Sequence, residues 1–275
     1  MEPTAPTDTL EAATRALERE QRELSRERRA LERFAKRVAA FETAVPRVSN
    51  SARRIGDEAP PGLTSVRKAY AETVMSVPHY AERYDDTWLE SIAEEFSDEL
   101  AAALAHHEIL SPQLKRSLLA ATRQSVRNRA QLLSSIETEC ESVAAAEREC
   151  SSLLEELTAL RNQPLERLEF NALWLTRERL EGLRERCDEL ADERQREIRR
   201  ERRFSLAEVG SLEQYLYQEC ERTYPVLAAI ATLGAALSRV LETVDRSLEA
   251  VVVEDAGRCG GDVRGRKSDA NPVIP

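Results

Sequence analysis

Leucine or valine recurs at every seventh position near the start of the chain. These positions are Leu10, Leu17, Leu24, Leu31, Val38 and Val45. No proline or glycine interrupts them, and a seven-residue apolar period keeps one narrow stripe of a helix against a partner helix. The pattern predicts an N-terminal coiled-coil helix over residues 1–45, with its helical part beginning near Asp8.

The second stripe of this helix is less apolar. With the leucines at heptad position a, the d positions hold Ala13, Glu20, Glu27, Phe34 and Phe41. Because a buried carboxylate without a partner is costly, we expect the N-terminal half to pack loosely along the a stripe alone. The candidate residues for self-association or contact with a partner protein are therefore Leu10, Leu17, Leu24 and Leu31.

Residues 46–63 contain several prolines and glycines and are predicted to be a linker. Two shorter helices are expected after it, over about 64–77 and 83–109. The second of these carries apolar residues at three- and four-residue spacings, which is typical of a compact bundle. We assign residues 64–110 to the first part of a small helical bundle.

A pair of long helices is predicted next. Ser111-Pro112 combines an N-cap serine with a first-turn proline, and no glycine or proline follows until Pro164. This stretch permits a helix of about 50 residues. After the break at Asn162-Gln163-Pro164, another helix is expected over about 165–203. Two long helices joined by a short break most simply fold back, so residues 111–203 are predicted to form an antiparallel coiled-coil hairpin. The first helix could lie beside it.

Residues 204–253 are expected to complete the bundle. A capping box at Ser205 and Glu208 precedes a helical region over about 211–252, which Pro225 should divide or kink. Its most apolar run is about 15 residues long, short of the roughly 20 that a membrane span needs, so we expect a buried helix and no span. Residues 254–275 lack periodicity and are predicted to be a disordered tail.

Composition supports helices throughout. Charged residues make up 33% of the chain, aromatic residues 5%, and there are only 9 glycines. No sustained alternation of apolar and polar residues suggests a strand. The predicted fold class is all-α, an elongated antiparallel coiled-coil hairpin with a small helical bundle.

Charge and cysteine content narrow the possible functions. The net charge of −10 disfavours broad affinity for nucleic acid, because the mean field repels phosphate. Arginine outnumbers lysine by 36 to 4, which a GC-rich genome explains as readily as selection for ion pairs. The five cysteines include no C-x-x-C pair, so we interpret them as reduced, mostly buried thiols of a cytoplasmic protein.

The sequence contains little that points to catalysis. His106-His107-Glu108 is the only cluster of candidate metal ligands, and adjacent helical residues point about 100° apart. Phosphate-binding glycine loops, nucleophile elbows and the Glu-x-x-His pairs of di-iron bundles are absent from the sequence. We therefore predict no enzyme activity, no catalytic or metal-binding residues, and no cofactor.

Four arginines fall within one arc near residue 200. They are Arg196, Arg199, Arg200 and Arg203. One interpretation is a ridge that contacts the phosphates of a nucleic acid. The other is a solvated face or a docking edge for an acidic helix, which the lack of nearby aromatic residues for base stacking favours.

Three stretches carry a resemblance to a known family. They are Ala69-Tyr70 through Thr73-Val74-Met75-Ser76-Val77-Pro78-His79-Tyr80, then Ser111-Pro112-Gln113-Leu114, and Tyr215-Leu216-Tyr217 with Thr223-Tyr224-Pro225-Val226-Leu227. Over residues 8–250 the chain resembles an all-helical family of halophilic archaea known as a domain of unknown function. The resemblance implies a cytoplasmic haloarchaeal protein with coiled-coil segments. It carries over no activity and no functional residues.

The sequence alone does not identify the biological role. The leading hypothesis is a non-enzymatic interaction or scaffold protein that acts through coiled-coil packing with itself or a protein partner. The alternative is a regulatory module that binds nucleic acid through the arginine face. A third idea is a helical-bundle enzyme with a pocket near Trp88, Tyr80 and His79.

Overall fold

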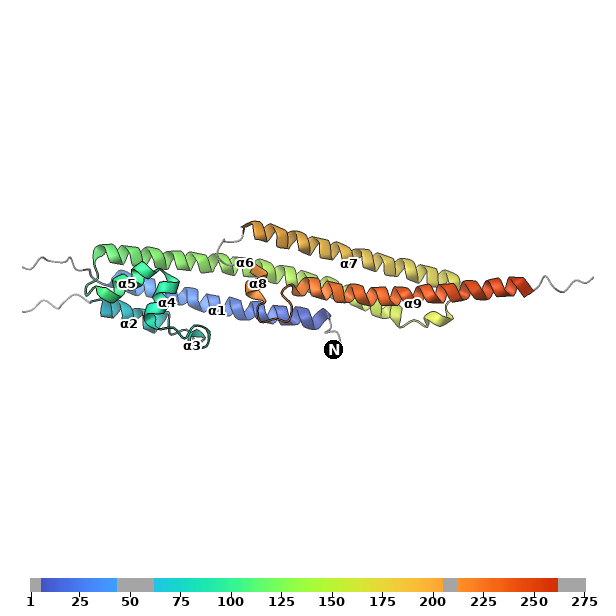
Figure 1. Ribbon diagram of the computed structural model, residues 1–275, viewed down its shortest axis with the longest axis horizontal. Coiled ribbons are helices and arrows are strands. Elements are labelled where there is room, and N and C mark those ends of the chain that lie inside the picture. Colours follow the sequence, from blue (N-terminus) through green and yellow to red (C-terminus); the bar gives the residue numbers. More distant parts are fainter. Residues whose placement is uncertain (1–5, 44–61, 205–211, 262–275) are drawn as a thin grey trace, which may run out of the picture. The chain divides into compact units, whose positions relative to one another are not determined.

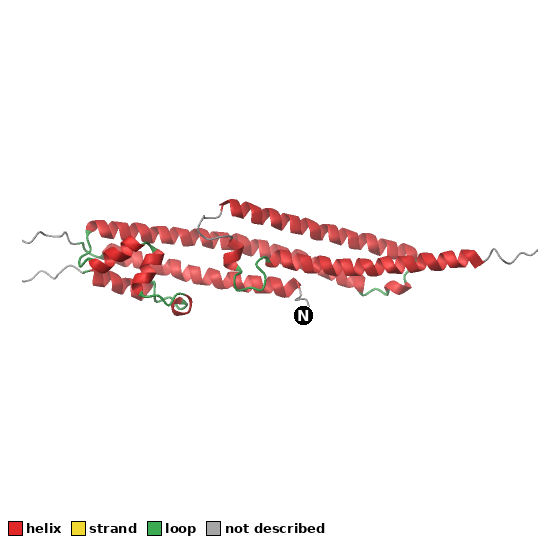
Figure 2. Ribbon diagram, in the orientation of Figure 1, coloured by secondary structure: helices red, strands yellow, loops and turns green. Residues whose placement is uncertain are grey.

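The computed structural model describes residues 6–43, 62–204 and 212–261, and this part of the chain consists of helices and loops without a strand (Figures 1 and 2). The prediction of an all-α fold is confirmed. The elements are α1 (Pro6–Ala40), α2 (Leu63–Thr73), α3 (Tyr80–Arg83), α4 (Trp88–Glu95), α5 (Asp98–His106), α6 (Pro112–Arg161), the 3₁₀ turn η1 (Leu165–Arg167), α7 (Phe170–Phe204), α8 (Leu212–Leu216) and α9 (Pro225–Gly261).

The chain divides into two compact units. The first unit comprises Leu17–Cys140, and the second comprises Met1–Ala16 together with Glu141–Pro275. Helices α1 and α6 each contribute residues to both units. The segment expected to be a linker, 46–63, lies almost wholly outside the described residues, as does the capping box expected at Ser205.

The long helix expected after Ser111 is α6, which has 50 residues. Its start is capped as the sequence suggested, because the Ser111 hydroxyl accepts a hydrogen bond from the Leu114 amide at 3.2 Å. The next helix begins later than predicted. Pro164 is followed by η1, so α7 starts at Phe170 and not at residue 165.

The single helix expected over 83–109 is wrong, because the structure has α4 and α5 there, preceded by the short α3. Two N-caps account for the division. Thr87 and Glu90 form a reciprocal capping box at the start of α4, and the Ser97 hydroxyl accepts from the Leu100 amide at the start of α5. Likewise, α2 ends at Thr73 and not near residue 77. The spacing of the apolar residues continues across these breaks, so the apolar pattern alone did not reveal them.

The first unit has a core of aromatic and aliphatic side chains. Phe34 of α1, Tyr70 of α2 and Phe96 after α4 form a trio, with ring centroids 5.2 Å apart for Phe34 and Tyr70 and 6.0 Å apart for Tyr70 and Phe96. The Tyr70 hydroxyl lies 2.8 Å from the Ser91 hydroxyl, so its buried polar atom is paired. The Lys115 ammonium donates to the carbonyls of Ala39 and Phe41, which joins the end of α1 to the start of α6.

In the second unit, α7 runs antiparallel to the last part of α6. Arg186 pairs with Glu149 and Glu156. Arg194, eight residues further along α7, donates to the hydroxyl of Ser142 at 3.0 Å. Later residues of α7 therefore contact earlier residues of α6, so the two helices are antiparallel. These ion pairs flank a buried apolar stripe that includes Leu153, Leu157, Leu180 and Leu183.

Helix α9 packs along α7 with the opposite direction. The Arg177 guanidinium donates to the Asp245 carboxylate at 2.8 Å, and the Cys187 thiol approaches the Ile230 carbonyl at 3.5 Å. Cys150 and Cys187 are both buried, in agreement with the prediction of mostly buried thiols. Burial raises the pKa of the Cys150 thiol to about 11, which keeps it protonated and suits a packing role.

The C-terminal helical region is divided at Pro225, as predicted, and extends further than predicted at its C-terminal end. Pro225 occupies the first position of α9, so the region expected over 211–252 is two helices, α8 and α9. Helix α9 continues to Gly261, whereas the tail was expected to begin at residue 254. The expected boundary was placed where the apolar period ends. A helix can continue without that period, and its next residues, Glu254, Asp255 and Ala256, are compatible with one. Residues 262–275 lie outside the described part.

Substitution of Leu153 by alanine tests the seam between α6 and its neighbours. Leu153 is fully buried, so Leu153→Ala should lower the free energy of unfolding by about 2–5 kcal/mol. Urea unfolding followed by circular dichroism measures the change. The matched control is Leu175→Ala, because Leu175 is 65% exposed and should change stability by no more than about 0.5 kcal/mol. Equal effects of the two substitutions would contradict the assigned seam.

Candidate functional site

A buried carboxylate in the middle of α1 organises the most polar part of the first unit. Glu27 is only 7% exposed. One of its oxygens accepts hydrogen bonds from His79 Nε2 and from the Tyr84 hydroxyl, each at 2.9 Å. The other oxygen accepts from Arg129 Nε at 2.8 Å. Three donors thus meet one acidic side chain, two from the ends of α3 and one from α6.

Arg129 of α6 links Glu27 to a second carboxylate. Its two terminal nitrogens donate to the two oxygens of Glu95 on α4, both at 2.7 Å, in the bidentate geometry that arginine favours. Arg129 therefore bridges α1 and α4 from α6. We call Glu27, His79, Tyr84, Glu95 and Arg129 the charge cluster.

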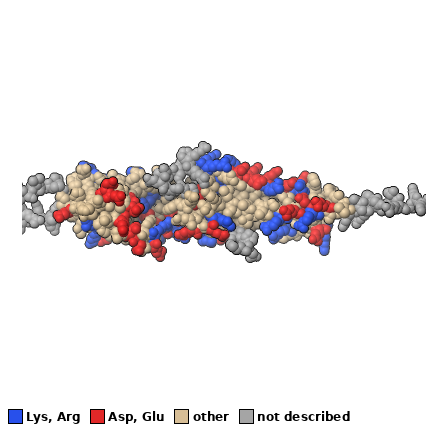
Figure 3. Space-filling model, viewed as in Figure 1, with Lys and Arg blue, Asp and Glu red and all other residues tan. Residues whose placement is uncertain are grey.

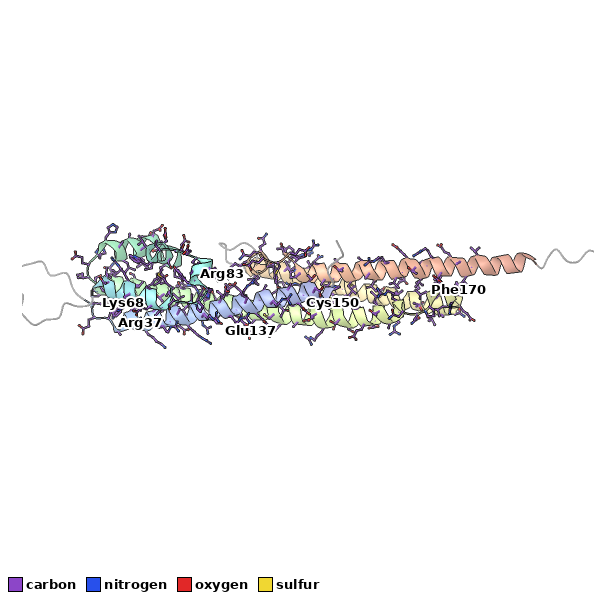
Figure 4. The ribbon with its side chains drawn as sticks, turned by 90° about the horizontal axis from the view of Figure 1, so that it is seen from below. Arg37, Lys68, Arg83, Glu137, Cys150 and Phe170 are labelled. Atoms are coloured by element: carbon purple, nitrogen blue, oxygen red, sulfur yellow. The ribbon has the colours of Figure 1, made fainter. Side chains whose placement is uncertain are left out.

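A second set of ion pairs continues along α1. Arg83, labelled in Figure 4, donates to Glu20 at 2.9 Å and also pairs with Glu23. The expectation of loose packing around Glu20 and Glu27 is therefore wrong. Both glutamates are buried, and arginines from distant segments meet them, which removes the cost of an unpaired charge.

The charge cluster shifts the acidity of its members. Burial by itself would raise the pKa of the Glu27 carboxyl, but Arg129, His79 and Tyr84 together hold it below its ordinary value. Burial and the negative charge of Glu27 raise the pKa of the Tyr84 hydroxyl. For the Arg129 guanidinium, the two carboxylates outweigh burial and raise the pKa. Glu27 is accordingly an anion and Arg129 a cation at neutral pH.

A cavity of about 180 Å³ lies beside the charge cluster, entirely within the first unit. Its lining combines charged, phenolic and aliphatic side chains. They are Glu27, Leu31, Val74, Val77, Tyr80, Tyr84, Asp86, Ser91, Glu94, Glu95 and Arg129. The cavity is smaller than the roughly 300–1,000 Å³ of typical ligand-binding pockets.

The pocket suggested near Trp88, Tyr80 and His79 is only partly assembled. Tyr80 lines the cavity, and His79 reaches it indirectly through Glu27. Trp88 does not line the cavity. Its ring lies under the Arg67 guanidinium at 4.8 Å. Sequence analysis missed Glu27, Glu95 and Arg129. The one available signal was a glutamate at a heptad core position, which implies a buried cation partner.

The candidate metal ligands His106, His107 and Glu108 lie at the end of α5, with His107 as its C-cap. His106 Nδ1 lies 2.8 Å from the carbonyl of Ala102 in its own helix. Within the described residues, no group of three or more histidine, cysteine, aspartate or glutamate side chains could hold a metal ion.

The leucine stripe of α1 is occupied within the chain. Leu10, Leu17, Leu24 and Leu31 are between 0% and 6% exposed. Their heptad partners are thus supplied by the chain itself, and these side chains present little free surface to a second molecule. Whether α1 also takes part in self-association stays a prediction.

The arginine face of α7 is exposed at three of its four positions, Arg196, Arg199 and Arg200. The side chain of Arg203 lies outside the described residues. Arg196 donates to the Asp192 carbonyl at 3.2 Å and Arg199 to the Gln195 side chain at 3.0 Å. Figure 3 shows acidic and basic side chains close together on the visible face of the molecule.

An apolar surface that the sequence did not single out lies at the start of α7. Phe170, labelled in Figure 4, and Trp174 stack with ring centroids 6.3 Å apart and are 42% and 46% exposed. Phe170 is seven residues before Arg177, and Val252 is seven residues after its partner Asp245. A seven-residue step keeps a helical residue on nearly the same side, so in this antiparallel pair Phe170, Trp174 and Val252 share one face. We call these three residues the aromatic patch.

One helix is long and apolar enough to cross a membrane. Pro225–Val253 of α9 meets both criteria, with a mean hydropathy of 1.5 in its most apolar window, of which 39% is buried. A core helix can satisfy the same criteria, so length and composition do not distinguish the two cases. The expectation that the chain has no membrane span therefore stays a prediction.

The fold and the site define an all-helical protein in which long helices are joined by apolar stripes and arginine–glutamate pairs. Residues 8–240 match a family model described as a domain of unknown function, DUF7260, and the chain belongs to that family. The comparisons found no matching curated protein and no matching solved structure.

Removal of the Glu27 charge should destabilise the first unit. Glu27→Gln keeps the side-chain shape but leaves Arg129 with one carboxylate, so we expect a loss of about 2–4 kcal/mol of unfolding free energy. Urea unfolding measures it. The control is Glu32→Gln on the same helix, where an exposed carboxylate lies 3.8 Å from Arg28. That substitution should cost less than about 0.5 kcal/mol, and a comparable loss would refute the special role of Glu27.

The stability difference between wild type and Glu27→Gln should depend on pH. The pKa of Glu27 is lower in the folded state than its ordinary value of 4.5, so its contribution is present above about pH 4.5 and is lost as pH falls through the folded pKa. Urea titrations of both proteins between pH 7 and pH 3 should converge at the acid end. A difference that stays constant over this range would contradict a folded-state carboxylate held by Arg129.

Proposed function

We propose that this protein is a non-enzymatic helical scaffold that acts by presenting packed helices to another protein. The exposed aromatic patch is the observation that carries this proposal. Solvent-exposed, stacked aromatic side chains are unusual on a monomer and are enriched at protein interfaces. Phe170, Trp174 and Val252 lie on one face of the α7–α9 pair, where a further helix could cover them.

The contacts that the charged side chains of the first unit make support a structural role for these side chains. Glu27 and Glu95 both bond to Arg129, and Arg83 bonds to two further glutamates, so these groups hold helices together. We propose that this helix packing is of the coiled-coil type and involves α6, α7 and α9.

The partner we propose is a second copy of this chain. The aromatic patch is bordered by charges of both signs, Arg177 and Glu178 on α7 and Asp245 on α9. Two copies related by a twofold axis can place the arginine of one opposite the carboxylates of the other, so the border is able to complement itself.

The acidic, arginine-rich and lysine-poor composition is the basis for the proposed setting, the cytoplasm of a halophilic archaeon. At high salt, ion pairs on the surface are screened and apolar contacts gain in weight. An association through aromatic side chains suits these conditions better than one through exposed arginines.

Sedimentation velocity over a concentration series tests the proposal. The wild type should self-associate, and Trp174→Gln should raise the dissociation constant at least ~10-fold, because a central aromatic side chain commonly dominates an interface. The matched control is Leu89→Gln, since Leu89 is a 38% exposed apolar residue of the first unit. It should leave association unchanged. A wild type that stays monomeric at every concentration, or equal effects of the two substitutions, would sink the proposal.

A further inference from the structure

A second cavity, of about 420 Å³, lies entirely within the second unit. It is formed by one side of α9, the C-terminal end of α6 and the turn η1. The residues that line it are Leu157 and Arg161 of α6, Leu165 of η1, and Ala236, Arg239, Val240 and Thr243 of α9. Its volume falls within the range of roughly 300–1,000 Å³ that is typical of ligand-binding pockets.

Helical spacing explains why these side chains meet at one cavity. Ala236, Val240 and Thr243 are separated by four and three residues, which places them on the same side of α9. Leu157 and Arg161 are likewise one turn apart on α6, and η1 contacts α9 directly. The cavity is therefore built from regular helices and from the turn that follows the break at the end of α6.

The charge around this cavity is positive. Among the described residues that line it, Arg161 and Arg239 are the only ionisable ones. Neither guanidinium forms an ion pair with another described residue, whereas Arg177 and Arg186 of the same unit are paired with carboxylates. Both side chains are exposed, so an anion can reach them without a rearrangement of the protein. In a chain with a net charge of −10, two unpaired cations from different helices at one cavity favour an anionic ligand.

Most of the remaining wall is apolar. Leu157, Leu165 and Val240 are buried, and Ala236 adds a small apolar side chain beside them. A ligand that consists of charge alone, such as a free phosphate ion, would leave this wall in contact with water. An anion with a hydrocarbon body matches both the guanidinium groups and the apolar wall.

We propose that this cavity binds the anion of an aliphatic carboxylic acid. The guanidinium groups of Arg161 and Arg239 donate hydrogen bonds to the carboxylate, and the alkyl chain packs against Leu157, Leu165 and Val240. Salt weakens the attraction between exposed charges, whereas apolar contacts persist, so the alkyl chain sustains binding where a bare anion is released. The aromatic patch contributes no residue to this cavity, so the proposal does not depend on the self-association proposed above.

Isothermal titration calorimetry of the full chain with sodium octanoate, below its critical micelle concentration, tests the proposal. Octanoate should bind in a saturable manner with one site per chain. Octylammonium chloride has the same chain with the opposite charge, and sodium acetate has the same head group without the chain. Both should bind at least ~10-fold more weakly, with ionic strength matched by sodium chloride. Equal affinity for either analogue, or no saturable binding of octanoate, overturns the proposal.

Two variants locate the binding groups. Arg161→Gln and Arg239→Gln each remove one exposed guanidinium from the cavity, so the fold should persist while affinity for octanoate falls about tenfold, the effect of one hydrogen bond to a charged group. The matched control is Arg184→Gln, which removes an exposed arginine of α7 that does not line the cavity and should leave affinity unchanged. Undiminished octanoate binding by either cavity variant, with native circular dichroism, overturns the assigned site.

Discussion

The burial of Glu27 imposes the strongest constraint on the first unit. A carboxylate removed from water in the middle of a helix must be met by donors, and here they come from Arg129, His79 and Tyr84. Arg129 then needs compensation of its own, which Glu95 supplies through two hydrogen bonds. Helices α1, α4 and α6 are therefore held in one arrangement, because loss of any member would leave another charge buried without a partner.

The second unit depends on a different balance. Its long helices bury a continuous apolar stripe, and the arginine–glutamate pairs between α6 and α7 lie along the border of that stripe, half exposed to solvent. Exposed pairs of this kind contribute little free energy each, so apolar burial supplies most of the stability. The pairs favour the observed antiparallel register, since a different register would separate Arg186 from Glu149 and Glu156.

The proposed self-association arises where this packing is incomplete. The aromatic patch leaves apolar surface of α7 and α9 in contact with water. A second apolar surface that covers the patch would remove that contact.

Local information in the sequence was enough to place the long helices. The apolar period and the Ser111-Pro112 start located α6, and the period of α1 identified which of its residues would be buried. The division of the region around α4 and α5 was missed because caps at Thr87 and Ser97 outweigh an uninterrupted apolar pattern. For the site, the sequence showed glutamates at the core positions Glu20 and Glu27, but the prediction drawn from them was loose packing. Tertiary structure alone decided that His79 and Arg129, 52 and 102 residues away from Glu27, would be those neighbours. The physical reason is that helical periodicity is a property of neighbouring residues, whereas a buried charge is satisfied by whichever donor the fold brings to it.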